Sequence, residues 1–135
     1  MSTTHEEEIP DIRTFATGAT RSPLADKLEY DGYLNPLVLK RFAEYMRKHQ
    51  TQSNGERRAS DNWQLNIPMA SLHDSKKRHD HDVWLHIKGY PEEATESMEE
   101  SLCAAIFGNM AMLKQVMEQS GRGTGGLQQL ISAIE

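Results

Sequence analysis

The chain has 135 residues, 37% of them apolar and 26% charged, and its formal net charge at pH 7 is −5. This length fits one modest domain and leaves little room for a second independent core. The acidic balance provides no global positive field for duplex nucleic acid, the single cysteine excludes an internal disulfide, and no apolar run approaches the roughly 18–20 residues of a membrane span.

The first 13 residues combine Ser and Thr with a run of three glutamates before Pro10. This composition is typical of a flexible acidic arm or of a strap across a partner subunit. The opening MSTTHEEEIP differs from the basic start of a secretory signal, so we expect a cytoplasmic protein. Residues 14–36 contain two glycines and two prolines, which predicts an irregular but ordered loop.

The first two helices are predicted from their end signals. One starts at Pro36, because Asn35 before it resembles an N-cap with proline at the first helical position, and it ends before the polar segment TQSNGERRASDN. The next starts near Pro68 or Ser71 and ends at Gly89, a residue suited to the position after a helix.

The third helix has the clearest pattern. Ser97 and Glu100 form a capping box at its start. Apolar residues then recur with a period of 3.6 and predict a core-facing stripe: Met98, Leu102, Ala105, Ile106, Leu113, Val116 and Met117. Asn109 falls on this stripe, so it needs hydrogen-bond partners if it is buried, either as an internal clamp or as a contact to a base or ribose.

The segment GRGTGG ends this helix, and LQQLISAIE after it predicts a short amphipathic tail that docks in cis or on a neighbouring chain. We therefore expect an all-α fold, a small bundle of three main helices plus a short C-terminal helix, with an irregular N-terminal arm. The expected organisation is a flexible acidic arm over 1–13, a single helical domain over 14–120, and a Gly-rich linker with the tail over 121–135.

The segment RHDHDVWLH, residues 78–86, carries the densest chemistry. His79, Asp82 and His86 share one helical face and are a possible set of transition-metal ligands, although no matching ligand pair occurs elsewhere in the chain. A second interpretation is a solvated face in which Arg78 and Asp82 form an i, i+4 ion pair. A third is a nucleotide contact, because guanidinium and imidazole donors recur around phosphates.

Three carboxylates, those of Glu96, Glu99 and Glu100, fall within about one turn at the start of the third helix. They are a possible Mg²⁺ site, and they also complement the helix dipole without any ligand. Elsewhere Trp63 and Trp84 are candidates for stacking on a base or for core packing. The segment TGATR places Arg21 beside hydroxyls and a glycine, a composition compatible with phosphate contacts.

Taken in order, the segments TFATGATRS, LEYDGYLNPLVLKRFAEYM, DNWQLNIP, SKKRHDHDVWL and ESLCAAIFGNMAML resemble a family of small phage and prophage proteins, the dATP/dGTP diphosphohydrolase-like proteins. The resemblance covers roughly residues 14–117. It implies an all-α, MazG-like nucleotide pyrophosphohydrolase, typically oligomeric, that uses Mg²⁺ or Mn²⁺ to split a purine nucleoside triphosphate into monophosphate and pyrophosphate in an infected bacterial host.

Helical pyrophosphohydrolases of this type carry an E-E-x-x-E on one helix and an E-x-x-D on the next, and the predicted helices of this chain do not show that pattern. An enzyme would need an improvised metal site from Glu44, Asp82, Glu96, Glu99 and Glu100. In that hypothesis Glu100 and His79 are the catalytic residues, and Arg78 or Lys77 offsets charge on the pyrophosphate.

Two further hypotheses remain open. One is a nucleotide-binding protein without a metal centre, a sponge that sequesters a host defence signal and needs no cofactor. Its pocket, at a subunit interface of a homo-oligomer, would be formed by residues expected to contact the nucleotide: Arg21, Trp63, Arg78, His79, Trp84 and Asn109. The other is a helical adaptor that binds another protein through its apolar tail.

Overall fold

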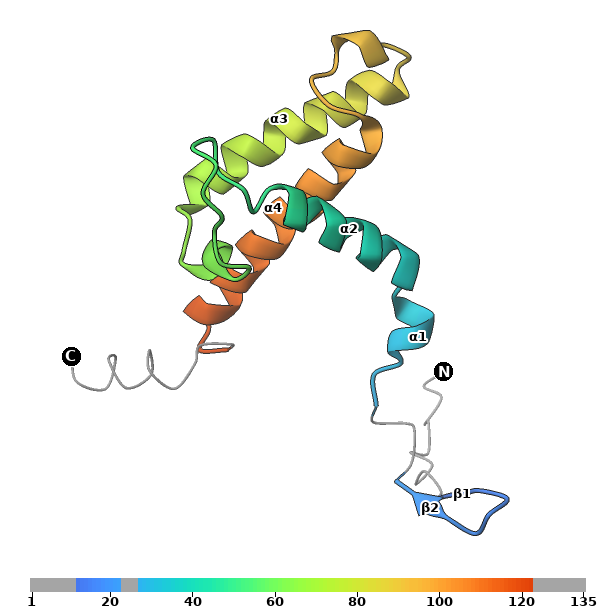
Figure 1. Ribbon diagram of the computed structural model, residues 1–135. Helices are drawn as coiled ribbons and strands as arrows, with labels where there is room; N and C mark the ends of the chain where they lie inside the picture. Colours follow the sequence, from blue (N-terminus) through green and yellow to red (C-terminus); the bar gives the residue numbers. More distant parts are fainter. Residues whose placement is uncertain (1–11, 23–26, 123–135) are drawn as a thin grey trace, which may run out of the picture. The chain divides into compact units, whose positions relative to one another are not determined.

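The computed structural model describes residues 12–22 and 27–122, and it is mostly helical, as the sequence predicts (Figure 1). The chain divides into two compact units, one ending at Asn35 and the other starting at Pro36. The predicted short C-terminal helix and most of the predicted N-terminal arm lie outside the described residues.

The first unit contains a small antiparallel hairpin of β1 (Arg13–Thr14) and β2 (Thr20–Arg21), in which Arg13 is opposite Arg21. Gly18 closes the turn with a φ of 87°, a conformation that glycine adopts without a Cβ penalty. Arg13 also donates from Nε to the carbonyl oxygen of Ser22 at 2.8 Å. The region expected to be an irregular loop is therefore partly regular, and the short helix α1 (Tyr30–Tyr33) follows the hairpin.

The second unit holds the three main helices, connected by two 3-10 turns. The elements in order are α2 (Pro36–Lys48), η1 (Asn62–Gln64), α3 (Met69–Ile87), η2 (Pro91–Glu93) and α4 (Met98–Gln119). The predicted helix starts and stops are confirmed, with Gly89 at a φ of 86° just after α3. At the start of α4 the hydroxyl of Ser97 accepts a hydrogen bond from the Glu100 amide at 3.2 Å, which confirms the N-cap.

Helices α3 and α4 pack along their lengths because α4 presents small residues to α3 (Figure 1). The buried residues of α4 are Ser101, Cys103, Ala104, Gly108 and Ala111. At Gly108 a Cβ atom would stand 3.4 Å from Cβ of Lys76, so the two backbones approach closely there. Leu72 is the buried apolar residue that α3 contributes in return.

Helix α2 crosses α4 and closes the other side of the core (Figure 1). Its buried residue is Tyr45, which forms the centre of the core with Cys103 and Ala104. Phe42, Met46 and Phe107 pack against this centre. The described core is small, and it depends on an aromatic ring and small side chains more than on large aliphatic ones.

The predicted core-facing stripe of α4 was wrong in its direction. Five of its six large members remain exposed, and Met117 is half-buried; the exposed members are Met98, Leu102, Ile106, Leu113 and Val116. The 3.6-residue period was real, but the face turned toward α3 carries serine, alanine and glycine, which sequence reasoning did not select as core. Asn109 is exposed together with the stripe.

Candidate functional site

The polar face of α3 docks the segment that leads into α4. Asp82, only 6% exposed, accepts a hydrogen bond from the hydroxyl of Thr95 at 2.5 Å. His86 contacts the carbonyl oxygen of Glu96 through Nε2 at 2.7 Å, and His79 Nδ1 lies 3.3 Å from Oε2 of Glu96. We call these five residues the polar seam. The helix face formed by His79, Asp82 and His86 therefore contacts its own chain. Asp82 accepts a hydrogen bond from Thr95 in place of the ion pair with Arg78 that the sequence suggests.

Glu96 is the least satisfied member of the polar seam. Its Oε2 atom is buried and receives no well-aligned hydrogen bond from the described residues, and the His79 ring lies 3.3 Å from it. A carboxylate beside an imidazole orients the ring. This pair is the arrangement in the seam that most resembles a general acid–base group.

A second cluster joins α2 to the start of α4, and we call it the ionic cluster. Arg41 donates to Glu99 at 2.9 Å and to Glu100 at 3.3 Å. Lys48 donates to the same Glu100 oxygen at 3.3 Å, and His49 lies 3.7 Å from the other one. Two of the five carboxylates proposed as metal ligands are thus paired with basic side chains of α2, which leaves little free negative charge for a cation here.

Tyr45 lies close to both groups of carboxylates. Its burial, and secondarily the negative charges of Glu96 and Glu100, raise the pKa of its hydroxyl to about 12. Burial also raises the pKa of the Cys103 thiol in the same core, against the influence of Arg41, which lowers it. Both groups therefore stay protonated at neutral pH, and neither is a ready nucleophile.

Within residues 12–22 and 27–122, no three His, Cys, Asp or Glu side chains are grouped as metal ligands would be. Glu44, the metal candidate on α2, is exposed and lies among basic residues. The Mg²⁺ or Mn²⁺ site stays a prediction, and a single copy of the described chain does not assemble its ligands.

Apart from Arg21, which belongs to the first unit, the residues expected to contact a nucleotide are spread over the second unit. Trp63 packs edge-on against Phe107 with ring centroids 5.9 Å apart, which is the core-packing alternative. Trp84 is 59% exposed beside His81, and it projects about 140° around α3 from His79 at 100° per residue. Arg78 and Asn109 are exposed on α3 and α4. Their assembly into one pocket stays a prediction.

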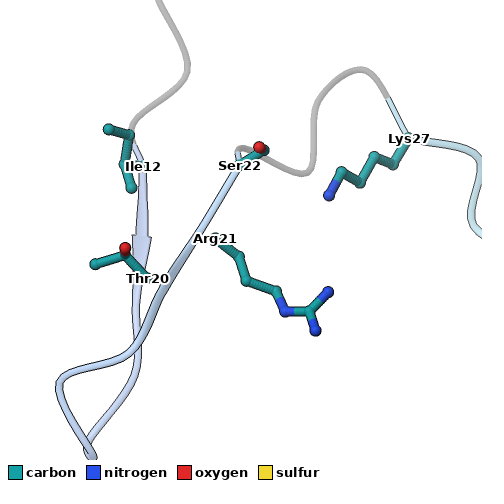
Figure 2. A pocket seen from close by; sticks show the side chains of 5 residues that line it. All are labelled: Ile12, Thr20, Arg21, Ser22 and Lys27. Carbon is teal, nitrogen blue, oxygen red and sulfur yellow. The ribbon is translucent and has the colours of Figure 1, made fainter.

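A cleft lies against the hairpin of the first unit, and we call it the hairpin cleft. It is lined by Ile12, Thr20, Arg21, Ser22 and Lys27. Figure 2 shows the side chains of Arg21 and Lys27 extending toward one another from two sides of this space. Two cations with two hydroxyls are suited to an anion such as a phosphate. The sequence pointed to Arg21, and it did not point to Lys27.

A second cleft of about 430 Å³, which we call the α2 cleft, lies beside the C-terminal half of α2. It is lined by Glu44, Arg47, Lys48, Thr51 and Arg57. The loop after α2 folds back on itself, pairing Thr51 with Arg57, which brings Arg57 to the cleft. The sequence did not predict Arg57 at this cleft, because the pairing within the loop places it there and helical spacing does not.

None of the helices in residues 12–22 and 27–122 combines the length and the apolar content needed to cross a membrane. In comparisons with known proteins, no family model, no curated protein and no solved structure matches the chain.

Proposed function

We propose that this protein binds a phosphorylated nucleotide at one of two cationic clefts and sequesters it without hydrolysis. The observation that carries the proposal is one of charge placement. The chain as a whole has a net charge of −5, yet the hairpin cleft and the α2 cleft together present five basic side chains and one carboxylate. Clefts of this kind concentrate anions against the overall charge of the molecule.

The ionic cluster also favours binding over hydrolysis. Metal-dependent phosphoryl chemistry needs carboxylates that are free to hold the cation against the phosphates. Glu99 and Glu100 are instead paired with Arg41 and Lys48. A protein that only holds a nucleotide needs positive charge for the phosphates and an aromatic face for the base, for which the exposed Trp84 is a candidate.

The direct test is binding of a nucleotide panel, including dATP, dGTP and cyclic nucleotides, by calorimetry. Arg57→Gln should weaken binding by about tenfold or more, because a hydrogen bond to a charged group contributes about 1.5–3 kcal/mol. Lys40→Gln, which removes an exposed charge on α2 outside the α2 cleft, is the matched control and should bind as the parent does. Equal affinity of the two variants would exclude the α2 cleft as the phosphate site.

Hydrolysis is the second candidate, and the contact of His79 with Glu96 is the observation that favours it. In that case the protein is a purine (deoxy)nucleoside triphosphate pyrophosphohydrolase dependent on Mg²⁺ or Mn²⁺, in which His79 accepts a proton from the attacking water. Incubation with nucleotide and metal, followed by chromatography, separates the two. Intact nucleotide recovered after heat denaturation supports sequestration. Pyrophosphate release that is lost in His79→Gln supports the enzyme.

A further inference from the structure

The most exposed face of α4 is apolar. Between Ser101 and Glu118 the exposed residues of α4 are Leu102, Ile106, Asn109, Leu113 and Val116. We call these five the apolar stripe. Its four aliphatic members keep between 42% and 59% of their surface exposed, although the helix has polar residues that would suit water better.

Those polar residues are turned inward. Gln115 donates to the carbonyl oxygen of Ile67 at 2.5 Å, and Lys114 donates to that of Gln64 at 3.4 Å. From Ser101 to Leu113 the helix contains no charged residue, whereas 26% of the whole chain is charged. Depletion of charge on an exposed surface distinguishes the centre of a protein interface from ordinary surface.

The spacing of the apolar stripe identifies the kind of partner. Its members follow one another at intervals of four, three, four and three residues, which is the heptad spacing of helices that pack side by side. The single polar member, Asn109, lies at the centre with two aliphatic residues on each side. A lone Asn in such a seam fixes register and oligomeric state, because its amide must find a partner across the interface. Because α4 itself carries this spacing, α4 of a second copy would present the matching positions.

The size of the surface fits a concentration-dependent association. The apolar stripe spans 15 residues of α4, so it is about 22 Å long on a helix about 10 Å across. Half of that side surface is about 350 Å² on each copy and about 700 Å² for two copies, an area in the range of weak, transient interfaces.

We infer that α4 packs against α4 of a second copy of this chain through the apolar stripe, with Asn109 setting the register. The same face would otherwise leave four large aliphatic side chains in water on a protein whose own core is small. In this arrangement Asn109 acts in assembly, and its expected nucleotide contact becomes a competing role.

The test is the mass of the full chain in solution, measured by sedimentation velocity over a range of concentrations. The parent protein should be a dimer or a multiple of one, and Leu113→Glu should weaken association at least tenfold and give monomer. Ile87→Glu is the matched control, since it places the same charge at an exposed apolar position of α3, and it should keep the mass of the parent.

Circular dichroism shows whether Leu113→Glu keeps its helices. If it does not, Leu113→Gln is the second variant, because it keeps the volume and the helix propensity while removing the apolar surface. A parent protein that is monomeric at every concentration would overturn the inference and would mean that the tail, another protein or water covers the stripe. A Leu113 variant that stays folded and keeps the parent mass would overturn it equally.

Discussion

Thr95 and Glu100 show how single side chains fix the start of α4. The Thr95 hydroxyl satisfies the buried Asp82 from a position 13 residues away, and the Glu100 carboxylate joins α4 to two basic residues of α2. Both contacts bring together groups that belong to different elements. Each has a measurable consequence for folding stability.

Replacement of Thr95 by Val should lower the free energy of unfolding by about 1–3 kcal/mol, because it keeps the side-chain shape and leaves a buried acceptor unsatisfied. Thr95→Ser keeps the hydroxyl and should retain most of the stability. Urea unfolding at neutral pH measures both. Equal losses in the two variants would show that the methyl group matters and that the hydrogen bond to Asp82 does not.

Glu100 predicts a loss of stability in acid. Burial raises the pKa of its carboxyl, and hydrogen bonds from Lys48 and Arg41 lower it by more, so the pKa lies below its ordinary value of 4.5. A depressed pKa stabilises the folded state above the unfolded value, and that stabilisation is lost as pH falls through the folded pKa.

The free energy of unfolding should therefore fall as pH decreases below about 4.5, and Glu100→Gln should remove this part of the slope. Urea titrations at a series of pH values give the slope for each protein. Identical pH profiles for the parent and Glu100→Gln would contradict the assignment.

At the scale of elements, the close approach of α3 and α4 depends on Gly108. An Ala there meets Lys76 at 3.4 Å, an ordinary contact with a flexible side chain, and it raises helix propensity by about 1 kcal/mol. Gly108→Ala should therefore be neutral or stabilising. Gly108→Leu should destabilise by about 1–3 kcal/mol, because a long side chain forces the helices apart. Thermal unfolding followed by circular dichroism compares the two, and equal melting temperatures would show that the helices are not in close contact.

The elements themselves were largely predictable, because their signals are local. Proline at 36 and glycine at 89 act through their own backbone, and serine at 97 acts through a hydroxyl that accepts from an amide three residues on, so the ends of three helices follow from the sequence. The orientation of α4 was not predictable in the same way. Periodicity identifies an apolar face and does not say what covers it. The face that α3 covers fits because its residues are small, and small residues score low in a hydrophobicity pattern.

The candidate site was less predictable than the fold for a related reason. Arg41 and Glu99 are 58 residues apart in sequence, and the polar seam joins α3 to a segment beyond a loop. A cluster of histidines resembles a metal site as long as the residues that contact it are unknown. Here the partners are groups of the same chain, and they appear only when α3 and α4 pack.

At the scale of the whole molecule, the described core residues all belong to the second unit. A fragment of residues 36–135 should therefore keep its helices and unfold cooperatively. Circular dichroism and urea unfolding test this. The fragment lacks the hairpin cleft and keeps the α2 cleft, so its nucleotide affinity relative to the full chain shows which cleft binds the phosphates. A fragment without helical signal would mean that the first unit stabilises the second.

Self-association through the apolar stripe predicts a melting temperature that rises with protein concentration, because a partner that binds the folded state stabilises it by mass action. Calorimetry at several concentrations measures the rise, and Leu113→Gln should remove it. A melting temperature independent of concentration in the parent would argue against coupling of association to folding.

The position of the lone cysteine has a kinetic consequence. Cys103 is 5% exposed where α2 crosses α4, and its thiol is held protonated, so a thiol-specific dye has neither access to the sulfur nor a reactive thiolate while that crossing is closed. The rate of labelling would then report how often α2 separates from α4. The single native thiol thereby measures the local opening of the core without any substitution in the chain.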